Sequence, residues 1–341
     1  MNGNPYDTIN LLSKLSPKRL WNIVLVYLSF HYSRLSRKPV HPAMPVSVSI
    51  EPTTSCNLRC PECPSGLRSF TRPTGMLDPV FFQRIVDQIK DKIFYLTFYF
   101  QGEPFLNPDF LEMVSYAASK NMYTATSTNA HYLTDEVARK TVESGIDRLI
   151  ISIDGTSQET YEQYRVGGSL SKVKEGTKRI VDWKKKLNSS KPYLVFQFLV
   201  VRPNEHEVSD VKRLAKEMGV DKVVFKTAQV YDFKNGNDLI PVNEKYSRYK
   251  KMSNGTYEIK NSLKNQCWKL WHSSVITWDG AVVPCCFDKD AKYKMGTLHE
   301  KSFSEIWNDV PYTEFRSRLL ESRKEIDICK NCSEGTRVWS D

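Results

Sequence analysis

Three cysteines, Cys56, Cys60 and Cys63, lie within the short segment TTSCNLRCPECPSG, and no fourth cysteine is nearby. A tetrahedral zinc ion can use three thiolates and complete its shell with a distant histidine. A [4Fe–4S] cluster can instead bind three irons through thiolates and leave its fourth iron open to an exogenous ligand. In either case the spacing predicts a site whose fourth ligand comes from outside this segment.

The other five cysteines form a second group near the C-terminus: Cys267, Cys285, Cys286, Cys329 and Cys332. Disulfides would be spread more evenly, and a spacing such as Cys329-x-x-Cys332 is typical of metal or cluster ligation. Cys267, Cys285, Cys329 and Cys332 supply four ligands and therefore predict a closed site. Adjacent cysteines rarely both bind one metal, so Cys286 is the alternative to Cys285. A structural zinc ion with four thiolates is the alternative to a cluster.

From residue 46 onward, strand-length apolar runs alternate with stretches of helical period. The predicted strands are 46–51, 95–100, 123–128, 148–153, 193–200 and 222–227. The predicted helices are 78–90, 109–120, 134–144, 157–187 (interrupted at VGGSLS) and 206–218. Six βα units predict an α/β fold, a partial (β/α)6 TIM-like barrel, with a doubly wound sheet as the alternative.

Polar segments follow the predicted strands, so the chemistry gathers at one edge of the sheet. TTSCNLRCPEC follows the first strand, QGEP the second, TNAH the third and DGTS the fourth. We expect an N-terminal amphipathic helical extension over 1–45, a barrel core over 46–228, a connector over 229–262 and a small α/β domain over 263–341. The last carries a hairpin around Asp279-Gly280 and a helix near 303–321.

The segment CNLRCPEC resembles the CxxxCxxC signature of radical S-adenosylmethionine (radical SAM) enzymes. The resemblance implies a [4Fe–4S] cluster on Cys56, Cys60 and Cys63, with SAM on its open iron. It also implies reductive cleavage of SAM to a 5′-deoxyadenosyl radical that abstracts hydrogen from a substrate. The usual core of this family is a partial (β/α)6 barrel, in agreement with the strand count.

Further segments are similar to family motifs and imply cofactor-binding residues. Gly102 and Glu103 match the turn that receives the amino group of SAM, although Gln101 replaces the first glycine. Ser127 and Asn129 match the stretch after strand three, Ser152 and Asp154 the segment near the ribose, and Arg165 a partner of the SAM carboxylate. Each has a plainer interpretation as turn or capping chemistry. Glu62 departs from the family, which often has an aromatic residue there to support the adenine.

The tail resembles the SPASM/twitch extension of radical SAM proteins, in its short form with one auxiliary [4Fe–4S] cluster on the four cysteines. Such a cluster implies an electron acceptor for a substrate radical, although a purely structural role is the alternative. Deprotonation of the substrate radical needs a base. Asp288 is the candidate, with Asp290 as its alternate; an ordinary surface carboxylate is the plainer interpretation of both.

The predicted partners follow from these assignments. We expect an oxidoreductase or modifying enzyme that acts on a peptide, with a sugar-like or lipid-linked small molecule as the alternative, and a reductant such as flavodoxin or ferredoxin. A cluster- or zinc-binding scaffold or redox sensor is the non-enzymatic alternative. The net charge of +10 is scattered, so no nucleic acid is expected.

The N-terminal segment RLWNIVLVYLSFHY is apolar and has basic flanks. It is too short to span a membrane. We expect a helix packed on the main domain, with peripheral membrane contact through residues 18–38 as the alternative. No cleavage site follows the segment, so we expect a cytoplasmic protein.

Overall fold

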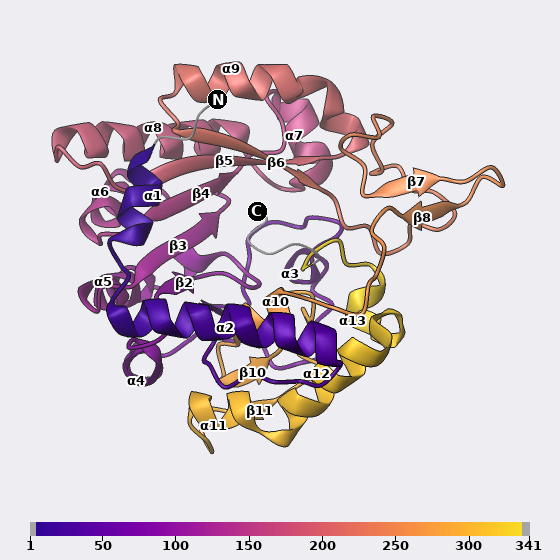
Figure 1. Ribbon diagram of the computed structural model, residues 1–341. Coiled ribbons are helices and arrows are strands. Elements are labelled where there is room, and N and C mark those ends of the chain that lie inside the picture. The colour runs from indigo at the N-terminus through magenta and orange to yellow at the C-terminus, as the bar shows by residue number, and fades with distance from the viewer. Residues whose placement is uncertain (1–4, 336–341) are drawn as a thin grey trace.

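The computed structural model describes residues 5–335 and contains a nine-stranded sheet in the order β11-β10-β9-β1-β2-β3-β4-β5-β6 (Figure 1). Six strands in the middle and at one end run parallel, each beside the next in the chain. They are β1 (Ser47–Ile50), β2 (Tyr95–Thr97), β3 (Tyr123–Thr128), β4 (Arg148–Ser152), β5 (Tyr193–Val200) and β6 (Lys222–Thr227). The predicted partial (β/α)6 barrel is confirmed.

Helices connect these strands and cover the outer face of the curved sheet (Figure 1). They are α4 (Pro79–Ile89), α5 (Phe110–Ser119), α6 (Asp135–Glu143), α7 (Gln158–Tyr164), α8 (Leu170–Lys186) and α9 (Val208–Glu217). The Asp78 and Thr134 side chains accept hydrogen bonds from backbone N–H groups three residues on, which explains where α4 and α6 begin. The stretch predicted over 157–187 is two helices, divided at residues 165–169.

The C-terminal region extends the same sheet, which the sequence pattern did not predict. Strand β9 (Ser273–Ile276) pairs in parallel with β1. Strand β10 (Ala281–Val283) returns antiparallel beside β9, and β11 (Gly296–Thr297) completes that edge. Gly280 has φ +80° in the turn between β9 and β10, as expected for the Asp-Gly hairpin.

Two predicted segments differ from the structure in detail. The helix expected over 303–321 is divided into α11 (Phe303–Asn308) and α12 (Val310–Ser322), because Asp309 caps a new helix that has Pro311 in its first turn. The connector over 229–262 is not wholly irregular: β7 (Tyr249–Lys251) and β8 (Tyr257–Ile259) form a hairpin that projects from the body (Figure 1).

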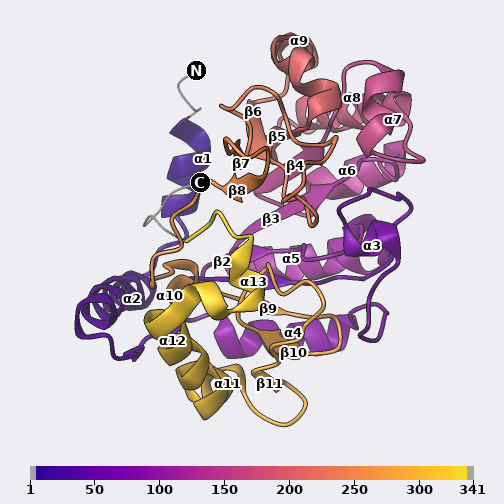
Figure 2. The same ribbon diagram turned by 90° about the vertical axis from the view of Figure 1, so that its right-hand side faces the viewer.

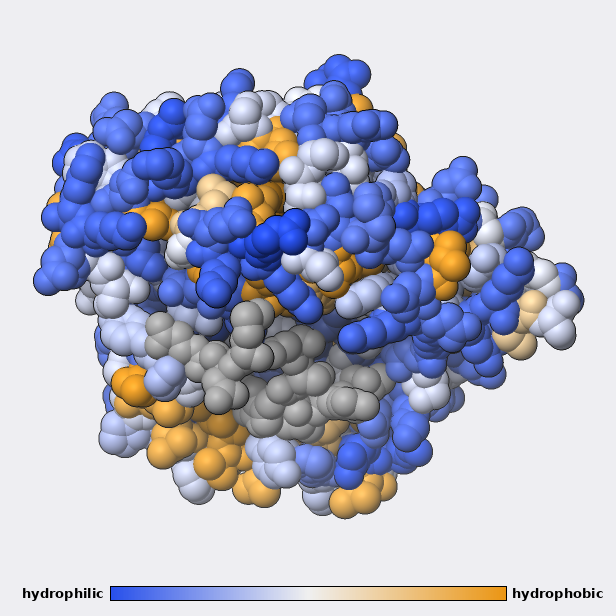
Figure 3. Space-filling model, turned by 90° about the horizontal axis from the view of Figure 1, so that it is seen from above, coloured by the Kyte–Doolittle hydropathy of each residue, from blue (hydrophilic) through white to orange (hydrophobic). Residues whose placement is uncertain are grey.

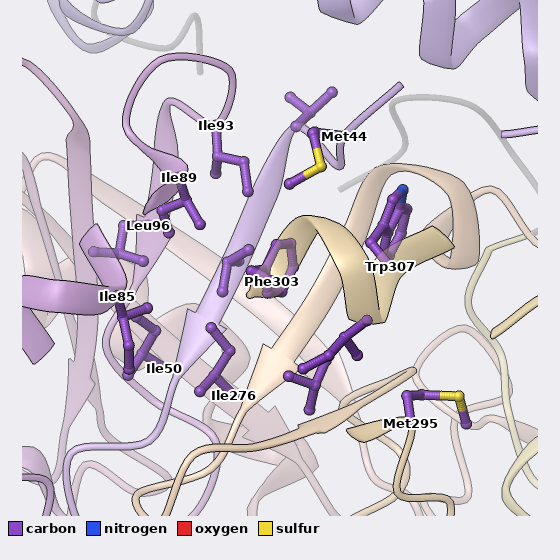
Figure 4. Packing of buried hydrophobic residues seen from close by; sticks show 14 of the residues in the cluster. Met44, Ile50, Ile85, Ile89, Ile93, Leu96, Ile276, Met295, Phe303 and Trp307 are labelled. Carbon is purple, nitrogen blue, oxygen red and sulfur yellow. The ribbon is translucent and has the colours of Figure 1, made fainter. Parts of the chain in front are cut away.

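One hydrophobic core joins the first strand, helix α4 and the tail (Figure 4). Ile50 of β1 and Ile276 of β9 lie side by side, and Phe303 and Trp307 of α11 pack on the same side of the sheet. The Trp307 indole N–H also donates to the Ala43 carbonyl over 2.8 Å. Burial of such aromatic side chains contributes about 2–3 kcal/mol each, so the tail is firmly held on the barrel.

Two helices, α1 (Pro5–Leu12) and α2 (Pro17–Ser36), lie in the segment for which a helical extension is predicted. Asp7 of α1 accepts hydrogen bonds from Arg148 and from the Tyr123 hydroxyl, so α1 lies at the end of the barrel where the strands begin. Helix α2 lies across the outside of the molecule (Figure 1). No helix within residues 5–335 is long and apolar enough to cross a membrane.

Candidate functional site

The first cysteine group lines a cavity of about 250 Å³ at the carboxyl ends of the parallel strands. Cys56, Cys60 and Cys63 lie within electrostatic reach of one another. Burial raises the pKa of Cys56 to about 11 and also raises that of Cys60, so a cationic partner is needed before these thiols ionise. Three soft sulfur donors on one cavity wall fit a cluster held by three thiolates.

Gly102 fixes the cysteine loop against the turn after β2. Its φ is +78°, and a Cβ atom at this position would lie 2.2 Å from the Thr53 carbonyl oxygen. The turn is joined to the loop by a 2.7 Å hydrogen bond from the Glu103 N–H to the Ser55 carbonyl. The first role of Gly102 is therefore to permit this close approach of two backbones.

Glu103 is almost fully buried beside the cysteines and lines the cavity. Its carboxylate accepts hydrogen bonds from the Thr128 hydroxyl at 2.6 Å and from the Asn129 N–H at 2.7 Å. Burial raises its pKa to about 7, although these hydrogen bonds oppose the shift. Glu103 can therefore exchange a proton near neutral pH.

Three other predicted residues face the same cavity. The Ser127 and Ser152 hydroxyls lie 3.3 Å apart on neighbouring strands. The Asn129 amide donates to the Asn57 side chain at 2.7 Å and lies 4.0 Å from the Cys56 sulfur. Side chains distant in sequence thus converge because parallel strands end at one edge.

Asp154 and Arg165 form a pair in which only the arginine lines the cavity. The Arg165 Nε donates to the Asp154 carboxylate at 2.5 Å, and its Nη1 lies 3.9 Å from the Cys60 sulfur. Asp154 is fully buried, and its second oxygen accepts from the Leu199 N–H at 2.7 Å. In this arrangement Asp154 acts on the cavity through Arg165, not by direct contact.

Several cavity residues were not identified from the sequence. Gln197 was detectable, because it is a lone polar residue in the apolar strand YLVFQFLV and its side chain points inward. The remaining ones follow no motif: Leu58, Ser65, Gly66, Tyr99, Phe100, Thr128, Tyr164 and Leu199. Glu62 lies outside the cavity lining, and its carboxylate accepts from the Tyr231 N–H at 2.9 Å.

Tyr99 and Gln197 also line a second cavity, of about 390 Å³, inside the barrel. Residues at every second position of β4 and β5 face it, as the strand period requires, and β6 also contributes to its lining. Its charged lining residues are cationic: Arg148, Lys222 and Lys226. Strand β6, which lines this barrel cavity, is an edge strand of the sheet.

Three cysteines of the second group lie close to the buried residue Arg323. Its guanidinium lies 3.4 Å from the Cys332 sulfur and within electrostatic reach of Cys267 and Cys329. The backbone approaches closely here too, since a Cβ atom at Gly335 would lie 2.3 Å from the Cys267 sulfur. Convergent thiols with a buried cation fit an anionic cluster.

Cys285 and Cys286 face different neighbours, although their thiols share a hydrogen bond. Cys285 lies within electrostatic reach of Cys332 and Cys267, whereas Cys286 faces Lys269. The arrangement favours Cys285 as the fourth ligand, and that assignment stays a prediction. Within residues 5–335 no group of three or more Cys, His, Asp or Glu side chains is arranged to hold a single metal ion.

Asp288 lies in the wall of a third cavity, of about 510 Å³, between the segment after Cys63 and the tail. Its two carboxylate oxygens accept the N–H groups of Lys292 and Tyr293 at 2.9 and 2.8 Å. Asp290 accepts the Thr71 N–H at 2.8 Å. Both carboxylates therefore hold loops in place, and a catalytic role for Asp288 stays a prediction.

Two family models match the chain. Residues 50–215 match the radical SAM superfamily, and residues 267–333 match the iron–sulfur cluster-binding domain called SPASM. Together the two segments make up well over half of the chain. Both cysteine groups lie inside the matched segments.

Characterised proteins are similar over most of their length. A tungsten-containing aldehyde ferredoxin oxidoreductase cofactor-modifying protein of Pyrococcus furiosus is 29% identical, over 83% of this chain and 86% of that protein. The PqqA peptide cyclase of Gluconobacter oxydans is 23% identical, over 87% and 85%. An S-adenosyl-L-methionine-dependent 2-deoxy-scyllo-inosamine dehydrogenase of Niallia circulans is 23% identical, over 84% and 92%.

The solved structure of Streptococcus suis SuiB bound to precursor peptide SuiA has a TM-score of 0.63 and 13% sequence identity. The match covers 97% of this chain and 75% of SuiB. At this level of identity the likeness shows a shared fold and no more.

The close approach at Gly102 makes a testable prediction. Gly102→Ala should destabilise the protein by more than about 2 kcal/mol, because it adds a clash to the strain of a positive φ. Gly255→Ala is the matched control, since Gly255 has φ +85° and a Cβ atom there would have no other atom within 4 Å. It should cost about 1 kcal/mol. Thermal unfolding followed by circular dichroism measures both, and equal costs would contradict the packing argument.

Proposed function

Since the chain belongs to the radical SAM superfamily and carries a SPASM iron–sulfur domain, we propose that this enzyme modifies a peptide held in the barrel cavity. A [4Fe–4S] cluster with SAM on its open iron supplies the 5′-deoxyadenosyl radical that abstracts hydrogen. The observation that carries the proposal is the position of the barrel cavity, which shares Tyr99 and Gln197 with the cysteine-lined cavity. A substrate there lies next to the site of hydrogen abstraction.

The residues of the cysteine-lined cavity are proposed to hold SAM by charge and hydrogen bonding. Glu103, presented by the Gly102 turn, accepts the amino group, and Arg165 pairs with the carboxylate. Ser127, Asn129 and Ser152 form hydrogen bonds with other polar groups of SAM. Asp154 sets the direction of the Arg165 guanidinium through their 2.5 Å hydrogen bond.

The auxiliary site is proposed to use Cys267, Cys285, Cys329 and Cys332 as ligands. The buried Arg323 guanidinium offsets the negative charge of their thiolates. We propose that the auxiliary cluster accepts an electron from the substrate. Asp288 stays the proposed base, although its two backbone hydrogen bonds favour a positioning role. The proposed electron source is a flavodoxin or ferredoxin.

Two features of the barrel cavity support a peptide. It is lined in part by the edge strand β6, along which an extended chain can pair through its backbone. Its lysines, Lys222 and Lys226, suit acidic side chains, whereas its third cation, Arg148, already pairs with Asp7. The similar PqqA peptide cyclase is named for a peptide substrate.

A second candidate substrate is a phosphorylated sugar-like or lipid-linked metabolite. The same two lysines suit a phosphate group, and the similarity to a scyllo-inosamine dehydrogenase favours a small hydroxylated molecule. A volume of about 390 Å³ is within the usual range for a small-molecule site.

Mass spectrometry distinguishes the two candidate substrates, because only the true substrate changes mass on incubation with the enzyme. The enzyme is co-expressed with the short peptides encoded beside its gene, and each peptide is analysed by mass spectrometry. We expect one peptide to lose two hydrogens or gain a cross-link. Unmodified peptides, together with oxidation of a phosphorylated sugar by the reconstituted enzyme, would contradict the peptide proposal and favour the second candidate.

The two cysteine groups should behave differently on mutation. Anaerobically reconstituted protein should hold about eight irons, and Cys63→Ala should abolish release of 5′-deoxyadenosine from SAM with dithionite. Cys329→Ala should remove about four irons yet leave SAM cleavage measurable without product. Cys286→Ser is the control and should keep all the iron. SAM cleavage by Cys63→Ala would contradict the cluster assignment.

The buried Glu103 predicts a pH dependence for SAM binding. Because burial raises its pKa to about 7, Glu103 is mostly neutral below that pH and attracts the amino group of SAM only above it. The Kd for SAM should therefore fall by up to about tenfold per pH unit as pH rises toward 7, and then level off.

Equilibrium dialysis of reconstituted enzyme from about pH 6 to pH 8 measures this dependence. Glu103→Gln is the isosteric control and should bind SAM weakly with no step near pH 7. A wild-type Kd that is constant over the range would show that Glu103 does not carry the charge that holds the amino group.

A further inference from the structure

Helix α2 turns its large apolar side chains toward solvent. Apart from Pro17 and Lys18, every exposed residue of the helix is aliphatic or aromatic, with exposed fractions from 37% at Val24 to 78% at Leu35. Their spacing of three and four residues places them on one face. We call this set the α2 apolar face: Leu20, Trp21, Val24, Tyr27, Leu28, Tyr32 and Leu35.

The opposite face of α2 is buried and carries several polar residues, so the helix is inverted relative to an ordinary surface helix. The Arg19 guanidinium donates to the carbonyls of Lys14, Lys90 and Asn121 at 2.6–2.7 Å. The Asn22 side chain exchanges two hydrogen bonds with the backbone of Met44. These contacts fix the rotation of α2, because turning the apolar face inward would leave buried polar groups unpaired.

The charges that the N-terminal segment itself places beside the apolar face have one sign. Residues 1–50 contain a single acidic residue, Asp7, which is buried and paired with Arg148. Lys18 stands near one end of the face, and Arg34, Arg37 and Lys38 stand near the other. A surface that meets the face should therefore be negatively charged.

The position of α2 leaves this face accessible. Figure 2 shows the helix nearly end-on at the margin of the molecule, with the sheet on its inner side and no other element of residues 5–335 on its outer side. Hydrophobic residues line the corresponding lower edge of the space-filling view (Figure 3). A contiguous apolar surface of this kind usually marks a binding site.

We propose that α2 docks the enzyme on an anionic lipid bilayer, with its axis parallel to the membrane plane. Its 20 residues span about 30 Å, and the apolar face would enter the boundary between headgroups and acyl chains. Trp21, Tyr27 and Tyr32 are of the residue types that prefer this boundary. The flanking lysines and arginines meet the lipid phosphates.

A second copy of the chain suits the face less well than a bilayer. Two such faces related by a two-fold axis would bring the basic ends of both helices close together, and the N-terminal segment supplies no exposed acidic residue to separate them. Lipid phosphates remove that repulsion. The charge pattern therefore favours the membrane as the occupant.

Docking would also set the orientation of the second cysteine group. Phe30 and Trp271 lie on the inner side of α2 with ring centroids 5.6 Å apart, and Phe30 and Trp268 lie 5.2 Å apart. Trp268 directly follows Cys267. The auxiliary cysteines would thus lie on the membrane-proximal side of the bound enzyme, joined to α2 by aromatic packing.

Co-sedimentation of the full-length protein with vesicles tests the proposal. Wild type should sediment with phosphatidylcholine vesicles that contain phosphatidylglycerol, less with pure phosphatidylcholine, and less at high salt. The double variant Trp21→Glu/Leu28→Glu should lower the partition coefficient by about tenfold or more, since each change removes an exposed apolar side chain that the bilayer would bury. Lys18→Gln/Lys38→Gln should reduce only the advantage of the anionic vesicles.

Val242→Glu/Val310→Glu is the matched control, because both valines are more than 60% exposed and lie outside α2, in the segment before β7 and at the start of α12. It should sediment as wild type does. Three results would overturn the proposal: no vesicle binding by wild type, undiminished binding by the α2 double variant, or a wild-type dimer that this variant dissociates. The last result would assign the face to a second copy of the chain.

Discussion

The parallel pairing of β9 with β1 is the contact on which the arrangement of both cysteine groups depends. Four residues of β1 stand in register with Ser273–Ile276, so the tail becomes part of the sheet that carries the first cysteine loop. A buried ion pair strengthens the same place: Arg72 donates two hydrogen bonds to Glu51, which follows β1, and Glu51 also accepts the Trp278 N–H after β9. Because burial raises the pKa of Glu51, removal of Arg72 would leave a costly carboxylate inside.

The polar side chains of the cysteine-lined cavity are positioned before any ligand arrives. Glu103 is held by Thr128 and Asn129, and Arg165 by Asp154, through hydrogen bonds of 2.5–2.7 Å. These residues come from different βα loops, and their mutual contacts hold each side chain in one orientation. Such preorganisation lowers the entropy lost when a charged cofactor binds. In our proposal Asp154 therefore has a role in cofactor binding although Asp154 does not line the cavity, because Asp154 orients Arg165.

The N-terminal helices show how polar contacts can determine where apolar residues lie. The inner face of α2 is fixed by Arg19 and Asn22, whose partners are backbone carbonyls and N–H groups of the barrel and its N-terminal segment. The apolar residues on its outer face remain 37–78% exposed in the fold of the single chain. These residues can be buried further only against another surface. In our proposal that surface is a lipid bilayer, so the inverted helix α2 would hold the enzyme at a membrane.

Local features of the sequence determined the elements and the chemistry of the first cysteine group. The predicted strands of the barrel match the observed ones within three residues, because strand period and the caps at Asp78 and Thr134 act over a few residues. The spacing of Cys56, Cys60 and Cys63 likewise predicts a site with three thiolate ligands without reference to any distant residue. The tertiary structure alone decided the pairing of β9 with β1, the position of Asp154 behind Arg165, and the outward apolar face of α2. Each depends on partners that are far apart in the chain, and their proximity is set by the packing of the whole sheet, which no local pattern records.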